Sequence, residues 1–109
     1  MDIRDVLHHI PARAVFDPDR MTKLDCFRST RLLVGLNAFE AGQSQRVHAH
    51  AGADKFYFVV SGKASFVVGS EDFEAATGDL IVAPDGVPHG VALAHERTIL
   101  LVAIAPAPA

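Results

Sequence analysis

The sequence predicts an all-β fold, either a sandwich or a closed barrel of short antiparallel strands. From Lys23 onward, β-branched and aromatic residues occur in short runs that Gly, Pro, Asp and Ser separate, a pattern typical of strands joined by tight turns. Glycines within residues 61–63, 69–70 and 77–79 fall where hairpins and sharp bends need a positive φ. Closure of these strands into a barrel would remove exposed sheet edges.

The elements can be placed in order along the chain. Val6, Leu7 and Ile10 share one face of a short helical turn that Pro11 ends. The expected strands then follow at 23–27, 31–39, 46–50, 55–60, 64–68, 72–75, 80–83, 90–94 and 97–104.

The length of 109 residues is that of one domain. We place this domain at residues 23–105. An N-terminal extension covers residues 1–22, and residues 106–109 form a Pro/Ala tail that we expect to be flexible because it lacks apolar bulk.

Composition and charge exclude several partners. Half of the residues are hydrophobic, which is enough for a core, and the net charge is only −3. The basic residues are scattered singly, so we expect no nucleic-acid partner. Apolar runs are too short to span a bilayer, and the charged N-terminus does not resemble a secretory signal. Cys26 is the single cysteine, which we interpret as a small buried hydrophobe in a cytoplasmic, reducing environment.

Histidines provide the candidate metal ligands. His48 and His50 would point to the same face of a strand, because side chains alternate with period two, and both imidazoles could then reach one ion. His89 follows a Pro- and Gly-rich turn, where by itself it would be a polar loop residue. The other histidines, which we expect to be solvated surface residues, are His8, His9 and His95.

Two motifs around these histidines resemble those of the cupin family. Residues 42–62 match the first motif, GxxxxxHxHxxxxExxxxxxG, except that Lys55 replaces the glutamate. Residues 78–89 match the second motif, GxxxxxPxGxxHxxxN, which departs only at Leu93 in place of asparagine. The resemblance covers residues 32–105 and implies a small single-domain, RmlC-like cupin with a double-stranded β-helix, the jelly-roll barrel.

The resemblance also implies a metal site and an assembly. His48, His50 and His89 would bind one divalent ion, which could be Fe, Mn, Ni or Zn, inside the barrel mouth. Three neutral imidazoles leave coordination positions open, as expected of a reactive site. Small cupins resemble homodimers in which a terminal strand joins the sheet of the partner, so we expect a homodimer.

Lys55 changes the charge at this site by two units. A protonated lysine about 4 Å from a dication would meet a repulsion of roughly 8 kcal/mol at an effective dielectric constant near 20. We expect its side chain to swing away towards Asp54 or another carboxylate; the alternatives are that it loses its proton or that metal binding is poor. Asp54 would become a ligand if the strand started one residue late.

Further residues are candidates for a substrate pocket. Tyr57 shares the inward face of Lys55 and could place its hydroxyl near the pocket, although such a tyrosine is often simply part of the core. Arg46 precedes His48 by two residues and could hold an anion at the mouth, or face solvent. Lys55 could itself stabilise the carboxylate or enolate of a substrate.

For function we expect a metal-dependent enzyme that acts on a small, polar or anionic metabolite. With iron it would carry out oxygen-dependent cleavage, as in the thiol and diketone dioxygenases that it resembles in lacking a carboxylate ligand; with another metal it would act as an isomerase, lyase or hydrolase. The alternative is a non-catalytic cupin that binds a small molecule or a metal. The fold alone does not identify the substrate.

Overall fold

The structure is a computed structural model that describes residues 1–109. Its elements, in chain order, are α1 (Ile3–Val6), β1 (Thr22–Arg28), β2 (Leu33–Phe39), β3 (Gln45–His48), β4 (Asp54–Ser61), β5 (Lys63–Val68), β6 (Glu71–Ala76), β7 (Leu80–Ala83), β8 (His89–Ala94) and β9 (Thr98–Ala105).

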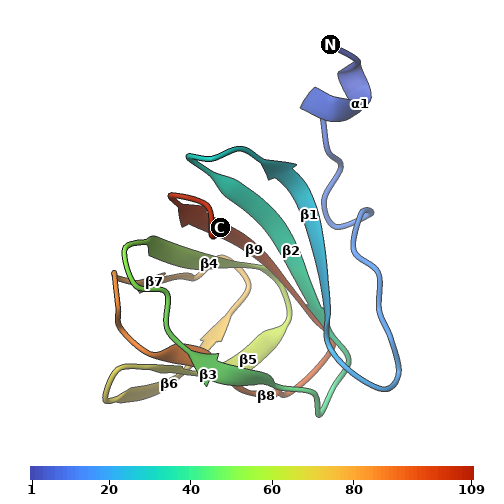
Figure 1. The fold of residues 1–109 in the computed structure, drawn as a ribbon. Helices are drawn as coiled ribbons and strands as arrows, with labels where there is room; N and C mark the ends of the chain where they lie inside the picture. Colours follow the sequence, from blue (N-terminus) through green and yellow to red (C-terminus); the bar gives the residue numbers. More distant parts are fainter.

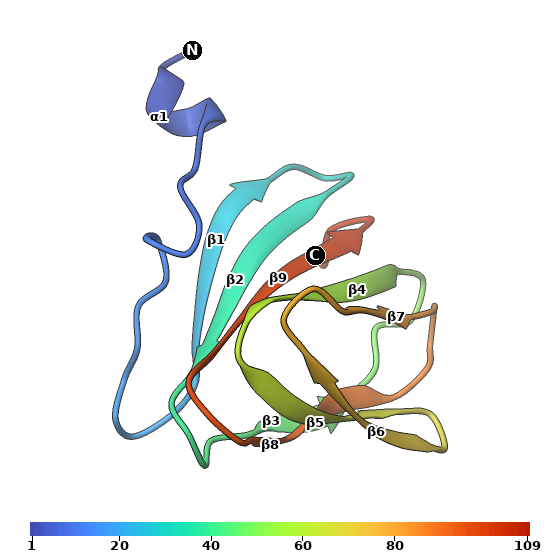
Figure 2. The same ribbon diagram turned by 180° about the vertical axis from the view of Figure 1, so that it is seen from behind.

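The strands form two antiparallel sheets that face each other around one core. One sheet has the order β1-β2-β9-β4-β7 and the other the order β3-β8-β5-β6. Figures 1 and 2 show the two sheets from opposite sides, curved around a common interior. This is a double-stranded β-helix, so the predicted all-β fold class is confirmed.

All nine predicted strands form, and their bounds differ by at most two residues from those expected. The largest differences are at the start of β2 and at the end of β3, which stops at His48. The helical turn at the N-terminus is shorter than expected, because α1 ends at Val6 and buries none of its residues. No helix in the structure is long and apolar enough to cross a membrane.

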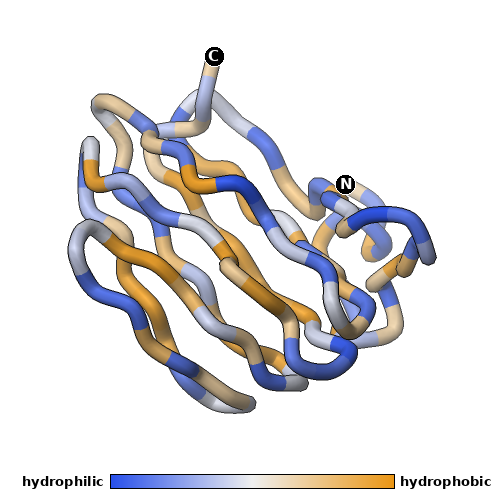
Figure 3. The backbone as a smooth tube through the Cα atoms, turned by 90° about the horizontal axis from the view of Figure 1, so that it is seen from below, coloured by the Kyte–Doolittle hydropathy of each residue, from blue (hydrophilic) through white to orange (hydrophobic).

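The core is built from the inward-facing residues of both sheets. Tyr57 and Val59 of β4 alternate with less buried neighbours, as the period of a strand requires. They meet Phe66 of β5 and Val91 of β8, and all four are at most 1 % exposed. Burial of each large side chain contributes about 1.5–3 kcal/mol. In Figure 3, hydrophobic stretches run along the strands, whereas hydrophilic residues gather at many of the turns.

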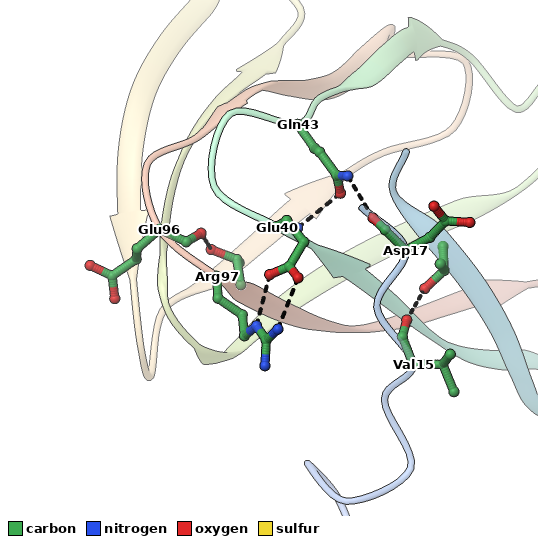
Figure 4. A network of polar contacts seen from close by, with 8 residues as sticks. Val15, Asp17, Glu40, Gln43, Glu96 and Arg97 are labelled. Atoms are coloured by element: carbon green, nitrogen blue, oxygen red, sulfur yellow. Dashed lines mark hydrogen bonds and ion pairs between the residues drawn. The ribbon is translucent and has the colours of Figure 1, made fainter. Parts of the chain in front are cut away.

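The N-terminal extension is fixed to the barrel next to the β2–β3 connection. The Gln43 amide donates to the carbonyl oxygen of Asp17 at 2.8 Å, and Arg97 makes two 2.8 Å hydrogen bonds to Glu40 (Figure 4). The Arg97 guanidinium also lies 4.1 Å from the ring centroid of Phe16. The helix α1 itself projects away from the barrel (Figure 1).

At the other end of the chain, the Pro/Ala tail folds back towards β1. The guanidinium of Arg28 donates a 2.9 Å hydrogen bond to the carbonyl oxygen of Pro108. Ala107 and Pro108 are therefore partly buried. The flexibility of residues 106–109 and the domain boundaries at residues 23 and 105 stay predictions.

Gly62, in the β4–β5 turn, is the glycine that the fold requires most strictly. Its φ is 106°, and a Cβ atom there would lie 2.5 Å from the carbonyl oxygen of Arg97 and 2.7 Å from the Cα of Thr98. Both neighbours are backbone at the start of β9, so they have little room to move. The turn can therefore pack on β9 only with glycine.

We predict that Gly62→Ala lowers the free energy of unfolding by about 3 kcal/mol or more, because backbone strain and a steric clash act together. Gly78→Ala is the matched control, since Gly78 has a φ of 93° but nothing within 4 Å of its Cβ position; it should cost only about 1–2 kcal/mol. Urea denaturation of both variants measures the difference. Equal losses would contradict the role of the contact with β9.

Candidate metal centre

Pairing of β3 with β8 brings the two histidine-bearing motifs together. His48 lies directly opposite His89 across the two strands, and His50 follows two residues beyond the end of β3. One ring nitrogen from each histidine lies within 4.8 Å of the others. The ring centroids are 4.5 Å apart for His48 and His89, and 4.9 Å apart for His48 and His50.

Two expectations about these histidines need correction. His50 does not share a strand with His48, because the chain leaves β3 and turns at Ala51–Gly52; His50 reaches the cluster from this loop. His89, which by itself would be read as a loop residue, begins β8 and is 1 % exposed.

Backbone carbonyls orient two of the rings. The Nδ1 atoms of His48 and His89 lie 2.9 Å from the carbonyl oxygens of Arg46 and Val87. A carbonyl oxygen can only accept, so Nδ1 carries the proton and Nε2 presents its lone pair. Metal-binding histidines are commonly fixed in this way by a hydrogen bond from their second nitrogen.

The Nε2 atom of His89 is the strongest indication that the cluster fits a metal. It is buried and has no hydrogen-bond partner, a situation that costs about 1–3 kcal/mol unless another group binds the nitrogen. Burial lowers the pKa of His89 to about 4, and the nearby charge of Lys55 acts in the same direction. Burial also lowers the pKa of His48 and His50. All three imidazoles are therefore neutral near pH 7, the form that binds metals.

Lys55 points into this cluster, so the expectation that it swings towards a carboxylate is wrong. Its Nζ lies 3.5 Å from Nε2 of His48 and 3.1 Å from the hydroxyl of Tyr57, and the residue is 5 % exposed. Strand alternation explains this, since Lys55 and Tyr57 share the inner face of β4. Asp54 faces the other way and accepts a 2.9 Å hydrogen bond from the backbone of Asp85, so it does not join the cluster.

The buried Lys55 is held by a chain of polar contacts. Its ammonium lies 4.4 Å from the Tyr57 ring centroid, and the Tyr57 hydroxyl donates to Oε1 of Gln45 at 2.5 Å. Burial, helped by the positive charge of Lys23, lowers the pKa of Lys55 to about 8. Burial raises the pKa of Tyr57 above its usual value, so its hydroxyl stays protonated and keeps donating to Gln45.

Gln45 is a site residue that the sequence analysis missed. It is 7 % exposed, and its Nε2 is buried without a partner. The β3–β8 register shifts between Gln45 and His48, so residues three positions apart both reach the interior, where regular alternation would separate them. Arg46, in contrast, has an exposed side chain, and its carbonyl oxygen is the group that contacts His48.

A pocket of about 220 Å³ opens beside His48, His50 and Lys55. Its volume lies below the usual range for drug-sized ligands, which indicates a small molecule. The opposite wall comes from β1, which contributes Lys23, Asp25 and Arg28, and Pro108 of the tail completes it. Sequence analysis did not connect β1 with this site, because only the order of strands in the sheet brings it there.

A double-stranded β-helix with a histidine cluster at the mouth defines a cupin-type barrel. The cupin domain family matches residues 35–105 of the chain. An uncharacterized protein of Streptomyces coelicolor, SCO3923, is 39 % identical over 85 residues, which cover 76 % of this chain and 78 % of that protein. The chain therefore belongs to the cupin domain family.

Solved structures agree with this assignment. TT1209 from Thermus thermophilus is 38 % identical with a TM-score of 0.88, and the match covers 94 % of this chain and 98 % of that chain. An RmlC-like cupin protein from Desulfovibrio desulfuricans is 33 % identical with a TM-score of 0.81, over 92 % and 96 % of the two chains.

The buried Lys55 makes a pH-dependent contribution to stability that can be measured on metal-free protein. Its pKa is about 8 when folded and about 10.4 when unfolded. The unfolded chain therefore holds more protons between these values. Above about pH 10.4 Lys55 is neutral in both states and does not destabilise the fold. This stability is lost progressively as the pH falls from there through about 8. Lys55→Met removes this effect.

We predict that Lys55→Met gains stability over the wild type at pH 7, and that this gain is about 1 kcal/mol smaller at pH 9. Urea denaturation of both proteins at the two pH values measures it. A gain that does not depend on pH would show that Lys55 is not held near neutrality by the barrel.

Proposed function

We propose that this chain is a metal-dependent enzyme that acts on a small anionic metabolite. The observation that carries the proposal is the buried, unpartnered Nε2 of His89, with nitrogens of His48 and His50 within 4.8 Å. These residues would hold one divalent ion, Fe, Mn, Ni or Zn. Such an ion supplies a Lewis acid, or with iron a centre for dioxygen chemistry, and three imidazoles leave positions open for a ligand.

Lys55 and its partners supply the second half of the proposed site. The Lys55 ammonium would donate hydrogen bonds to an oxyanion of the substrate where negative charge develops. Tyr57 holds the ammonium through its hydroxyl and ring, and Gln45 fixes that hydroxyl. Because these side chains are buried and hydrogen-bonded to one another, they form a preorganised site, which favours an enzyme over a simple metal store.

Metal content is the first test of the proposal. Protein purified without a histidine tag should contain close to one transition-metal ion per chain, and His48→Ala His50→Ala should lose it because two of the three ligands are gone. His95→Ala is the matched control, since His95 contacts Ser65 and Glu74 outside the cluster, and it should keep the ion. Elemental analysis after dialysis gives the stoichiometry.

Failure to bind any metal, even after reconstitution, would overturn the proposed enzyme. The chain would then be a non-catalytic cupin whose pocket binds a small molecule. Metal retained by the double variant would instead mean that the ion is bound elsewhere.

We further propose that the protein is a cytoplasmic homodimer. Support comes from the outer face of the five-stranded sheet, where Phe56 pairs with Val82 and Phe58 with Leu80. Leu80 and Val82 are 58 % and 57 % exposed, and contiguous apolar side chains at a surface mark interaction sites. The single cysteine, Cys26, agrees with a reducing compartment.

Val82→Asp should convert the dimer to a monomer, because a carboxylate in the centre of an apolar contact would be buried without a partner. Light scattering coupled to size-exclusion chromatography measures the mass. Asp72→Asn, a change on β6 in the other sheet, should leave the dimer intact. A monomeric wild type at micromolar concentration would contradict the proposal.

A further inference from the structure

The pocket beside the histidines has more positive than negative charge. Lys23, Lys55 and Arg28 line it, whereas its single carboxylate is that of Asp25. Asp25 lies 3.5 Å from the guanidinium of Arg28, so these two charges offset each other. Neither Lys23 nor Lys55 takes part in an ion pair with a carboxylate of the chain. Two ammonium groups therefore remain without a counter-charge.

A bound metal would increase this excess. The histidines are neutral and add no negative charge, and the one acidic residue within the first motif, Asp54, is hydrogen-bonded to the Asp85 backbone outside the pocket. Positive charge that is removed from water needs a partner of opposite sign. Because the buried Lys55 has no carboxylate partner in the chain, an anionic ligand would supply the negative charge that Lys55 and a bound ion lack.

The two ammonium groups stand at different places in the pocket. Lys55 belongs to β4 and is 5 % exposed, whereas Lys23 belongs to β1 and is exposed. Strands β2 and β9 lie between β1 and β4 in the sheet, so the two side chains start from strands that are not neighbours. A ligand with an anionic group at each end of a short spacer can meet both ammonium groups at once.

We propose that the pocket binds a small dicarboxylate, with one carboxylate at the histidine cluster beside Lys55 and the other on Lys23 at the rim. The volume of about 220 Å³ limits the spacer to a few carbon atoms. The inference deepens the proposed function and rests on it for the metal contact of the inner carboxylate. The outer contact, on Lys23, is independent of the metal.

Isothermal titration of malonate and succinate into wild-type protein of known metal content tests the proposal, with acetate and inorganic phosphate at matched ionic strength as comparison ligands. At least one dicarboxylate should bind more tightly than acetate and phosphate. Lys23→Ala should weaken dicarboxylate binding about three- to fivefold, the range of an exposed ion pair, and leave acetate binding and metal content unchanged. Lys55→Met should weaken the binding of both the dicarboxylates and acetate.

Lys63→Ala is the matched control, because Lys63 is an exposed lysine of β5 that pairs with Glu74 outside the pocket. A loss in this variant equal to that in Lys23→Ala would overturn the proposal, as would tighter binding of phosphate than of both dicarboxylates. Metal analysis separates the two proposals. Dicarboxylate preference without bound metal would contradict the proposed enzyme alone, and bound metal without this preference would contradict the dicarboxylate site alone.

Discussion

The close pairing of β3 with β8 is the constraint on which the candidate site depends. It sets His48 opposite His89, although the two lie in motifs far apart in the sequence. The strands can approach because Gly90 has no side chain: a Cβ atom there would lie 2.9 Å from the carbonyl oxygen of Gln45 and from the Cα of Val47. One absent methyl group thus allows the strand that carries a first-motif histidine to lie against the strand that carries the second-motif histidine.

Lys55 shows how the barrel accommodates a group that is costly to bury. The hydroxyl and ring of Tyr57 both contact its ammonium, and Gln45 in turn holds the hydroxyl. Hydrogen bonds and a cation–π contact offset part of the desolvation of the charge. The Nε2 atoms of Gln45 and His89 are likewise buried and have no hydrogen-bond partner.

Much of the fold could be predicted from the sequence, because strand patterns and turn glycines act locally. All nine strands were located, and the motifs indicated which histidines come together. Local patterns failed where backbone geometry is irregular: the register shift in β3 brought Gln45 inward, and the turn after β3 took His50 off the strand. The direction of Lys55 does not follow from electrostatic repulsion, because strand alternation places its side chain on the inner face of β4 with Tyr57. The contribution of β1 depends on strand order, which no local pattern contains.

The hydrogen bond from Arg28 to the carbonyl oxygen of Pro108 brings the end of the described chain to the rim of the pocket. Any sequence fused after Ala109 therefore starts beside His48 and His50. A polyhistidine tag at that end would deliver extra imidazoles to the cluster and compete with a small ligand for open coordination positions. An N-terminal tag begins next to α1, which projects away from the barrel (Figure 2). The choice of terminus for purification thus affects the metal content and ligand affinity that are measured.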